Sequence, residues 1–214
     1  MIWVARHGET TWNLVGRYQG RLESPLSPLG ERQGAALAAE FDARRQRNEP
    51  VPERIVSSPL VRCTATAQFV AERLGLEIER DERLIEIAHG TWEGRYRDEL
   101  AANDPVRYRT WREDPAHVAF ENGESLVDVL ARWETVAVDL ARETRPTLVV
   151  THDAVVRCAL LTAWQRSLDD FWQMPVENAA FATLEGDGER LHVVEACHAA
   201  HLAGLRASLE GQAL

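Results

Sequence analysis

Two histidines in the sequence each follow a short apolar run, at a place where a side chain could do chemistry. His7 comes after Ile2 to Ala5 and before Gly8, and His152 comes directly after the run Thr147 to Thr151. Runs of this length with β-branched and aromatic residues are typical of strands buried on both faces of a sheet. In an open α/β sheet, ligands bind beyond the carboxyl ends of the strands. Both histidines would therefore stand at a binding site.

Two arginines occupy comparable junctions. Arg6 directly precedes His7, and Arg62 falls in the first turn of a helix predicted to begin after Ser57-Ser58-Pro59. A cation is electrostatically disfavoured at a helix N-terminus, so Arg62 is either freely solvated or held there for an anion. A single histidine at a turn is more often structural, but two histidines and two arginines at equivalent junctions are hard to attribute to packing. We interpret the set as a phosphate pocket in which His7 is the nucleophile.

The elements that must position these residues alternate along the chain. Ser27-Pro28 predicts a capped helix to about Arg47, and Ser125 with Asp128 forms a capping-box-like start for another helix. Gly186-Asp187-Gly188 is typical of a hairpin turn. The expected strands are 2–5, 54–56, 76–80, 147–151, 181–185 and 191–195, and the expected helices are 28–47, 60–74, one beginning after 125, and 154–164. We expect an α/β fold in one domain, 1–214: a three-layer αβα sandwich whose central sheet is mostly parallel, with helices on both faces.

Two longer stretches fall outside this alternation. Thr11 to Pro28 is rich in Gly, Pro, Ser and Asn and is interpreted as a long loop, and loops of this length in compact domains are usually functional. From about 92 to 122, aromatic residues are interleaved with arginines. Arginines with aromatics also occur on nucleic-acid-binding surfaces, but the acidic chain disfavours that interpretation. We expect this segment to form a small helical lid over the pocket.

The composition limits the classes of function. With 24 Lys and Arg against 34 Asp and Glu, the 214 residues carry a formal net charge of -10, which disfavours binding of nucleic acid and of membrane surfaces. Cys63, Cys158 and Cys197 are odd in number and widely spaced, so neither a disulfide framework nor a zinc site is indicated. No segment resembles a secretion signal or approaches the ~20 apolar residues of a membrane span. We expect a soluble cytoplasmic protein, and a homodimer is compatible with the sequence.

Five blocks of sequence around these residues resemble the histidine phosphatase superfamily, in its phosphoglycerate-mutase-like branch. The blocks are Arg6 to Thr10 with Trp12, Asn13, Gln19-Gly20 and 24–30; Ser57 to Leu60 with Arg62, Thr66 and Ala67; Glu86 with 90–94; Gly123-Glu124-Ser125; and Thr151-His152. They occur in the family's order and span nearly the whole chain. The resemblance is therefore specific to the family and much less specific to any substrate.

The resemblance implies a role for each matched residue. His7 would accept the phosphoryl group as phosphohistidine, and Glu86 would protonate the leaving oxygen and then activate water. The phosphate oxygens would be surrounded by Arg6, Arg62 and His152 with Asn13 as a further donor, and the loop at Gln19 and Gly20 would contact the substrate. No metal or organic cofactor is expected.

Elementary chemistry agrees with these roles. Phosphoryl transfer needs positioning and stabilisation of charge on the equatorial oxygens, which arginine forks supply without a metal. Neighbouring arginines should lower the pKa of His7 from about 6.5, so that it attacks as neutral imidazole. An apolar setting should raise the pKa of Glu86, so that it is protonated for the first step.

Two features leave alternatives open. The family usually has glycine after the second histidine, whereas this chain has Asp153. Its carboxylate either caps the following helix or reaches His152 and favours the imidazolium. Cys197, His198 and His201 suggest a metal site, but their spacing lacks a fourth partner, and a metal site is not favoured.

Three activities from different classes fit this pattern. We favour a metal-independent phosphomonoesterase that hydrolyses a small phosphorylated metabolite through phosphohistidine. The alternative is a cofactor-dependent phosphoglycerate mutase, an isomerase, although the family's mutases tend to be longer and this chain has the Trp92 and Glu93 of phosphatase members. A non-catalytic phosphate-binding protein is least favoured, because every catalytic position is filled. Phosphoglycerate-type esters, sugar phosphates, α-ribazole phosphate and phosphoserine all remain candidate substrates.

Overall fold

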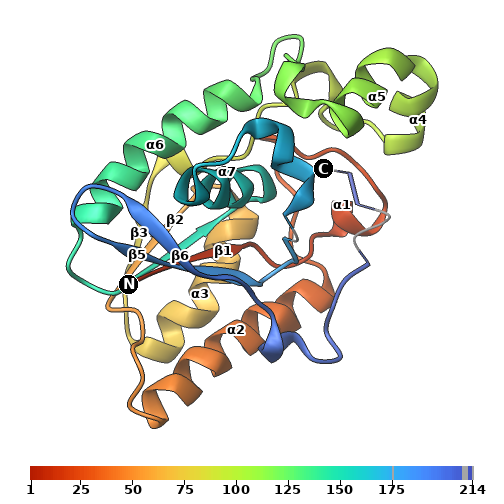
Figure 1. Cartoon of the computed structure of the whole chain (residues 1–214). Helices are drawn as coiled ribbons and strands as arrows, with labels where there is room; N and C mark the ends of the chain where they lie inside the picture. Colours follow the sequence, from red (N-terminus) through yellow and green to blue (C-terminus); the bar gives the residue numbers. More distant parts are fainter. Residues whose placement is uncertain (175, 209–211, 214) are drawn as a thin grey trace.

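A six-stranded sheet in the order β3-β2-β4-β1-β5-β6 forms the centre of the computed structural model, which describes residues 1–174, 176–208 and 212–213 (Figure 1). The strands are β1 (Ile2–Arg6), β2 (Arg54–Ser57), β3 (Ile78–Arg80), β4 (Thr147–Thr151), β5 (Phe181–Gly186) and β6 (Leu191–His198). The β1/β4, β2/β4 and β2/β3 pairs are parallel, and β5 is antiparallel to both β1 and β6. The expectation of a mostly parallel sheet is confirmed.

Helices cover both faces of this sheet (Figure 1). They are α1 (Thr11–Leu14), α2 (Pro28–Gln46), α3 (Val61–Leu74), α4 (Arg97–Asn103), α5 (Pro105–Glu113), α6 (Leu126–Arg142) and α7 (Asp153–Trp164), with short 3-10 turns at Glu82–Leu84, Gly90–Trp92, Pro115–His117, Leu168–Gln173 and Ala200–Leu202. Successive side chains of a strand point to opposite faces. Trp3 and Ala5 accordingly pack with α2 and α3, whereas Ile2 and Val4 pack with α6 and α7. The three-layer sandwich is confirmed.

The local signals in the sequence explain where most of these helices begin and end. Ser27 Oγ accepts the Gly30 N–H at 3.0 Å, and Pro28 opens α2. Ser125 caps α6 in a reciprocal box with Asp128. At the end of α3, Gly75 has a φ of 73°, the left-handed conformation that favours glycine.

The predicted elements differ from the structure mainly at their ends and in one loop. The strand expected at 76–80 is ordered as β3 only at Ile78–Arg80. The stretch Thr11 to Pro28, expected as a loop, contains the short helix α1. The prediction missed α1 because four residues show no periodicity. A capping box between Thr10 and Asn13 forms the turn instead.

The segment expected as a lid is helical and leaves the core at a narrow neck. Helices α4 and α5 stand apart from the sheet (Figure 1). Backbone hydrogen bonds join the two ends of the segment to each other. Thr91 N–H donates to Glu121 O at 3.1 Å, and Glu124 N–H donates to Ala88 O at 2.8 Å. Gly90 has a φ of +53°, and a Cβ there would lie 2.0 Å from Glu121 O. Glycine is therefore required where the two chain segments meet.

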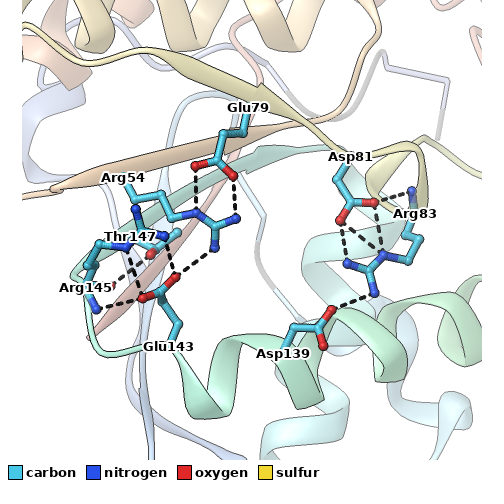
Figure 2. Close-up of polar contacts among 8 residues, drawn as sticks. All are labelled: Arg54, Glu79, Asp81, Arg83, Asp139, Glu143, Arg145 and Thr147. Atoms are coloured by element: carbon cyan, nitrogen blue, oxygen red, sulfur yellow. Dashed lines mark hydrogen bonds and ion pairs between the residues drawn. The ribbon is translucent and has the colours of Figure 1, made fainter.

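Ion pairs connect strands and helices at the β2–β3 edge of the sheet (Figure 2). Arg54 at the start of β2 contacts Glu79 of β3 at 2.5 Å and Glu143, just after α6, at 3.1 Å. Just beyond the carboxyl end of β3, Arg83 contacts Asp81 at 2.7 Å and Asp139 of α6 at 2.8 Å. These contacts fasten one end of α6 to the sheet edge. Among the described residues, no helix combines the length and the apolar character needed to cross a membrane.

Candidate active site

The two histidines lie side by side because β1 and β4 are neighbours in register. Arg6 pairs with Thr151, so the residues that follow each strand emerge at the same edge of the sheet. His7 N–H donates to Thr151 O at 2.9 Å. The rings of His7 and His152 meet edge to face, with their centroids 5.3 Å apart. The sequence placed both histidines at strand ends, and the strand order brings them into one site.

Hydrogen bonding determines which nitrogen of His7 carries the proton. Nδ1 lies 2.7 Å from Gly8 O, and a carbonyl oxygen can only accept, so Nδ1 must carry the hydrogen. Nε2 of the neutral ring then has a free lone pair. Burial lowers the pKa of His7 well below its ordinary value, and the charges of Arg62 and Arg6 lower it further. The predicted direction is confirmed, although burial contributes more than the arginines.

One pocket contains His7 together with most of the residues predicted for the site. It is lined by Arg6, His7, Asn13, Gln19, Gly20, Arg62, Glu86, Ile87, His89, Trp111, Asp153, Ala154, Phe171 and Ala213. Two of its buried N–H groups, Arg6 Nε and Asn13 Nδ2, have no hydrogen-bond partner among the residues that the structure describes. Buried donors are normally satisfied. A bound anion would supply the missing acceptors for both.

The two arginines are held in place mainly by hydrogen bonds to uncharged oxygens. Arg6 is completely buried, and its Nη2 donates to Gln212 Oε1 at 2.7 Å while Nη1 donates to Val176 O at 3.1 Å. Arg62 Nη2 donates to Gly20 O at 2.7 Å. Main-chain and amide oxygens orient both guanidinium groups, and Arg6 Nη1 also lies 3.5 Å from the Asp153 carboxylate. Arg62 at the first turn of α3 is thus held in place and is not freely solvated.

Gln19 and Gly20 meet the pocket through the loop that follows α1. Gln19 Oε1 accepts from Thr10 Oγ at 3.0 Å, which fixes the amide beside Asn13. Gly20 has a φ of +51°, and a Cβ there would lie 2.1 Å from Glu93 Oε1. That carboxylate accepts the N–H groups of Arg21 and His89, so Glu93 orders the loop as expected.

Glu86 is a carboxyl group of the pocket whose protonation is strongly shifted. It is 8% exposed, and its pKa is raised to about 7, mainly by burial and secondly by the charge of Asp153. An N–H donated by Ile87 and the charge of Arg62 act in the opposite direction. The predicted protonated carboxyl near neutral pH is confirmed in direction, and burial is again the main cause.

His152 is completely buried, and both of its ring nitrogens already have partners. Arg62 Nε lies 3.2 Å from Nδ1, and because arginine can only donate, Nδ1 accepts. Nε2 therefore carries the hydrogen and donates to Ser58 Oγ at 2.7 Å. Burial and the charge of Arg62 lower the pKa of His152 well below its ordinary value. In this arrangement His152 orients Arg62 and lies beside His7, and its predicted contact with the phosphate stays a prediction.

Asp153 follows neither of the two alternatives set out for it. It is the first residue of α7, and the N-cap position belongs to His152, whose side chain makes no capping hydrogen bond. The carboxylate instead pairs with Arg157, one turn along the same helix, at 2.6 Å and approaches Arg6 at 3.5 Å. The i, i+4 spacing brings Arg157 within reach, so Asp153 is committed to two arginines.

Cys197, His198 and His201 lie at the end of β6 and just beyond it, outside the residues that line the pocket. His201 Nε2 donates to Ala179 O at 3.0 Å, and the His198 ring stacks on Phe181 with a centroid distance of 4.7 Å. His198 Nδ1 also lies 3.2 Å from a Glu195 oxygen. The two histidines are thus engaged in packing and hydrogen bonds.

The pocket also contains a histidine for which the sequence offered no functional argument. His89 is 4% exposed, and neither of its ring nitrogens has a partner within the described part of the chain. Its ring packs against Tyr18, Trp111 and Phe120 at centroid distances of 5.0, 5.7 and 4.7 Å. Burial lowers its pKa to about 3, so the ring is neutral. The aromatic partners come from segments distant in sequence, which is why no local pattern revealed the site.

The chain matches known proteins along most of its length. The model of the histidine phosphatase superfamily (branch 1) matches residues 2–198. Phosphoserine phosphatase 1 of Hydrogenobacter thermophilus is 35% identical over 196 residues, which cover 89% of this chain and 88% of that protein. Glucosyl-3-phosphoglycerate phosphatase of Mycobacterium tuberculosis is 38% identical over 163 residues, 72% of this chain and 70% of that protein.

The fold matches solved structures as well. The structure of Bacillus stearothermophilus YhfR superposes with a TM-score of 0.82 at 31% identity, covering 91% of this chain and 95% of that one.

Proposed function

The chain belongs to the histidine phosphatase superfamily, branch 1, and is a phosphoric monoester hydrolase, and we propose that His7 is its covalent nucleophile. One observation carries the proposal. In a single buried pocket His7 is neutral with Nε2 unprotonated, two arginines lie beside it, and the pKa of Glu86 is raised to about 7. A neutral nucleophile and a protonated acid are what the first half of phosphoester hydrolysis requires.

The first step forms the bond between His7 Nε2 and phosphorus and breaks the bond between phosphorus and the ester oxygen. Glu86 gives its proton to the departing oxygen, which leaves as an alcohol. Arg6 and Arg62 stabilise the negative charge on the equatorial oxygens, and the buried donors Arg6 Nε and Asn13 Nδ2 bind those oxygens. Since arginines supply this charge, the scheme uses no metal.

The second step returns the enzyme to its starting state. The Glu86 carboxylate now takes a proton from water, and the hydroxide equivalent attacks phosphorus and breaks the bond to His7. Inorganic phosphate leaves, His7 is again neutral, and Glu86 is again protonated. The same carboxyl acts first as acid and then as base, and a pKa near the working pH suits both roles.

The substrate we propose is a small phosphorylated metabolite whose other end reaches His89. A neutral imidazole offers one donor and one acceptor, and in His89 neither is used by the described residues. A hydroxyl, amine or carboxylate on the alcohol side of the ester would pair with them. Phosphoserine carries such groups, and the name of the 35% identical relative makes it the first ester to test.

A phosphoglycerate mutase remains the alternative, in which phosphohistidine returns its phosphoryl group to a substrate hydroxyl. The phosphatase names of the relatives described above favour transfer to water. We further infer a cytoplasmic enzyme, because Cys63, Cys158 and Cys197 are free thiols. The net charge of -10 supports small-molecule partners without nucleic acid, and a homodimer stays open.

The test separates hydrolysis from transfer. The protein is incubated under EDTA with p-nitrophenyl phosphate and with phosphoserine, phosphoglycerates, sugar phosphates and α-ribazole phosphate, and inorganic phosphate is measured. Release supports the phosphatase, whereas conversion of 3-phosphoglycerate with 2,3-bisphosphoglycerate and little net phosphate supports the mutase. Turnover of none of these esters would favour a protein that binds phosphate without catalysis.

The nucleophile is identified by rapid-quench intact mass. A gain of one phosphoryl group that is acid-labile should appear in the wild type and be absent in His7→Ala. His192→Ala, a half-buried histidine at the β5–β6 hairpin, is the matched control and should keep the adduct. An adduct that persists in His7→Ala would sink the assignment.

A further inference from the structure

The peptide unit that joins His7 to Gly8 is held at both of its polar ends by residues that the scheme above does not use. The His7 carbonyl accepts from Asn178 Nδ2 at 3.2 Å and from the Ala179 N–H at 3.2 Å. The Gly8 N–H donates to Thr66 Oγ at 2.9 Å. Because a peptide unit is planar and rigid, fixing both ends fixes its whole plane.

The orientation of this plane bears directly on the nucleophile. The next carbonyl along the chain, Gly8 O, accepts the hydrogen from His7 Nδ1 at 2.7 Å. Glycine has no side chain that would restrict its backbone, so Gly8 cannot hold this carbonyl in place by itself. Gly8 O belongs to the Gly8–Glu9 peptide, whose N–H donates to Gln33 Oε1 at 2.8 Å, and its direction depends as well on how the preceding His7–Gly8 peptide is held.

Thr66 connects the peptide to the helix that carries Arg62. Its hydroxyl is completely buried and donates its single hydrogen to Arg62 O at 2.7 Å. The oxygen lone pairs are then available to accept the Gly8 N–H. Thr66 lies one turn after Arg62 in α3 and bonds to the peptide that follows His7. Its two hydrogen bonds therefore hold this peptide at a fixed position relative to Arg62.

Asn178 holds the other end and is itself oriented by a closed set of hydrogen bonds. Its Oδ1 accepts from Gln212 Nε2 at 2.8 Å, and Gln212 Oε1 accepts from Arg6 Nη2 at 2.7 Å. This leaves Nδ2 of Asn178 directed to the His7 carbonyl. Asn178 is 1% exposed. The contacts thus run from the Arg6 guanidinium through two amides back to His7.

The neighbouring backbone shows that this turn is held against its own preference. Ala179 has a φ of 59°, a left-handed conformation that non-glycine residues rarely adopt. Its N–H donates to Arg6 O at 3.0 Å as well as to His7 O, and its carbonyl accepts from His201 Nε2 at 3.0 Å. Such backbone conformations persist where surrounding contacts impose them, and they cluster at active sites.

We propose that Asn178 and Thr66 are positioning residues that clamp the His7–Gly8 peptide, so that Gly8 O retains the Nδ1 hydrogen and Nε2 is the nitrogen left to attack. The inference rests on the proposed role of His7. It adds that the attacking nitrogen is selected by two side chains that touch neither the phosphate nor the leaving group.

The test removes one end of the clamp at a time. Asn178→Ala removes the donor to the His7 carbonyl, and Thr66→Val removes the acceptor while keeping the shape of the side chain. Thr66→Ser keeps the hydroxyl and should restore function. Asn48→Asp, at an exposed asparagine, serves as the control for a change at asparagine remote from the site. Circular dichroism establishes that each variant is folded.

Two measurements distinguish positioning from general stability. The rate of phosphohistidine formation in rapid-quench experiments should fall by about 10- to 100-fold in Asn178→Ala and Thr66→Val. The KM should change by less than about threefold, because the phosphate ligands are intact. In 15N-detected histidine spectra, with His7 assigned by its loss in His7→Gln, the wild type should show protonated Nδ1, and the two variants should show a mixture of tautomers.

The outcomes separate this inference from the proposed function. Wild-type phosphorylation rates and a pure Nδ1–H tautomer in folded Asn178→Ala and Thr66→Val would overturn it, even if His7 is the nucleophile. Should Asn178→Ala not fold, the threonine pair decides, and equal rates for Thr66→Val and Thr66→Ser reject the clamp. Should His7→Ala keep the adduct, the proposed function fails, whereas the tautomer spectra still report on the clamp.

Discussion

His7 and Glu86 lie in the same buried pocket, and burial shifts each toward the protonation state that the proposed mechanism requires. Removing a charged group from water disfavours its charged form. The imidazole therefore loses its proton more easily, whereas the carboxyl holds its proton to a pKa of about 7. In the proposed mechanism, one environment thus prepares both the nucleophile and the acid through their shared burial.

The pH dependence of phosphohistidine formation should report on Glu86. The acid must be protonated for this step, so the single-turnover rate should be high below pH 7 and fall as the pH rises through about 7. Glu86→Gln should slow the step by about 10²-fold or more and abolish the fall. A fall at the same pH in Glu86→Gln would assign it to another group.

Substitution of Asp153 provides a second test by the same pH dependence of the single-turnover rate. Its negative charge raises the pKa of Glu86, so Asp153→Asn should move the fall in rate to lower pH. Asp139→Asn, which removes the same charge from an exposed position on α6, should leave it unchanged. An unmoved profile in Asp153→Asn would show that Asp153 acts only on Arg6 and Arg157.

His89 should contribute to substrate recognition and not to the chemistry at phosphorus. His89→Phe keeps an aromatic ring among Tyr18, Trp111 and Phe120 but removes both nitrogens. Loss of a hydrogen bond to substrate should raise KM for the best ester of the panel by about tenfold. The kcat/KM for p-nitrophenyl phosphate, whose aryl group lacks such partners, should change little. Equal losses for both esters would argue against a recognition role.

At the scale of elements, the helical segment α4–α5 borders the pocket, and its role as a lid stays a prediction. Trp111 of α5 lines the pocket, and its ring meets His89 and Phe120. The 3-10 turn at Leu168–Gln173 supports it, because Trp172 Nε1 donates to Trp111 O at 2.7 Å. The segment joins the core through the neck at Gly90 and Gly123, where a Cβ on either glycine would collide with a backbone oxygen.

If this segment closes over bound phosphate, ligand binding should protect it. Saturating orthovanadate, a phosphate analogue, should slow amide hydrogen exchange in α4 and α5 by about tenfold. Helix α2, which packs on the opposite face of the sheet from the α6–α7 core, provides the internal control and should change less. Equal protection in both would indicate general stabilisation instead of closure.

At the scale of the whole molecule, the proposed active site and the ion pairs of Arg54 lie at opposite ends of the sheet. The pocket lies beyond the carboxyl ends of β1 and β4, whereas the ion pairs of Arg54 and Glu143 lie at the amino end (Figure 2). Buried cations and a buried imidazole without hydrogen bonds do not favour folding on their own. The ion pairs far from the pocket can be strengthened or removed without touching the chemistry.

Low pH should remove the stabilising contribution of the Glu143 carboxylate at this end of the sheet. Hydrogen bonds from Arg145 lower the pKa of Glu143 to about 2, below its ordinary 4.5. A carboxyl with a lowered pKa stabilises the fold above pH 4.5, and this contribution is lost as the pH falls toward 2. Glu143→Gln should therefore lower the free energy of unfolding by up to about 1 kcal/mol at pH 7, discounted for its exposure to solvent.

Urea unfolding at pH 7 and at a pH near 2 measures the difference in the free energy of unfolding between the wild type and Glu143→Gln. This difference in the free energy of unfolding should become smaller as the pH approaches 2. Glu189→Gln, at an exposed carboxylate in the β5–β6 turn, should have the same free energy of unfolding as the wild type at either pH. A difference that persists undiminished at low pH would mean that the glutamate contributes through packing and not through charge.

The sequence by itself determined the parts of this protein that depend on neighbours along the chain. Strand runs, the Ser27 and Ser125 caps and the Gly75 stop follow from local backbone chemistry, so they could be located before any tertiary contact was known. The five blocks of resemblance likewise identified His7, Arg62 and Glu86 as a set. The short helix α1 was missed because four residues are too few to show the spacing of apolar residues that is typical of a helix.

Only the tertiary structure decided which distant groups meet. The pairing of Arg6 with Thr151 makes the two histidines neighbours, and the folding of the chain brings Gln212 to Arg6 and Asn178 to His7 across more than 170 positions. Asp153 faces Arg6 and Arg157, which neither local alternative foresaw. Hydrogen bonds and burial act through space, so the tautomer of His7, the leading part of burial in the pKa shifts of His7 and Glu86, and the neutral ring of His89 could be read only from the folded chain.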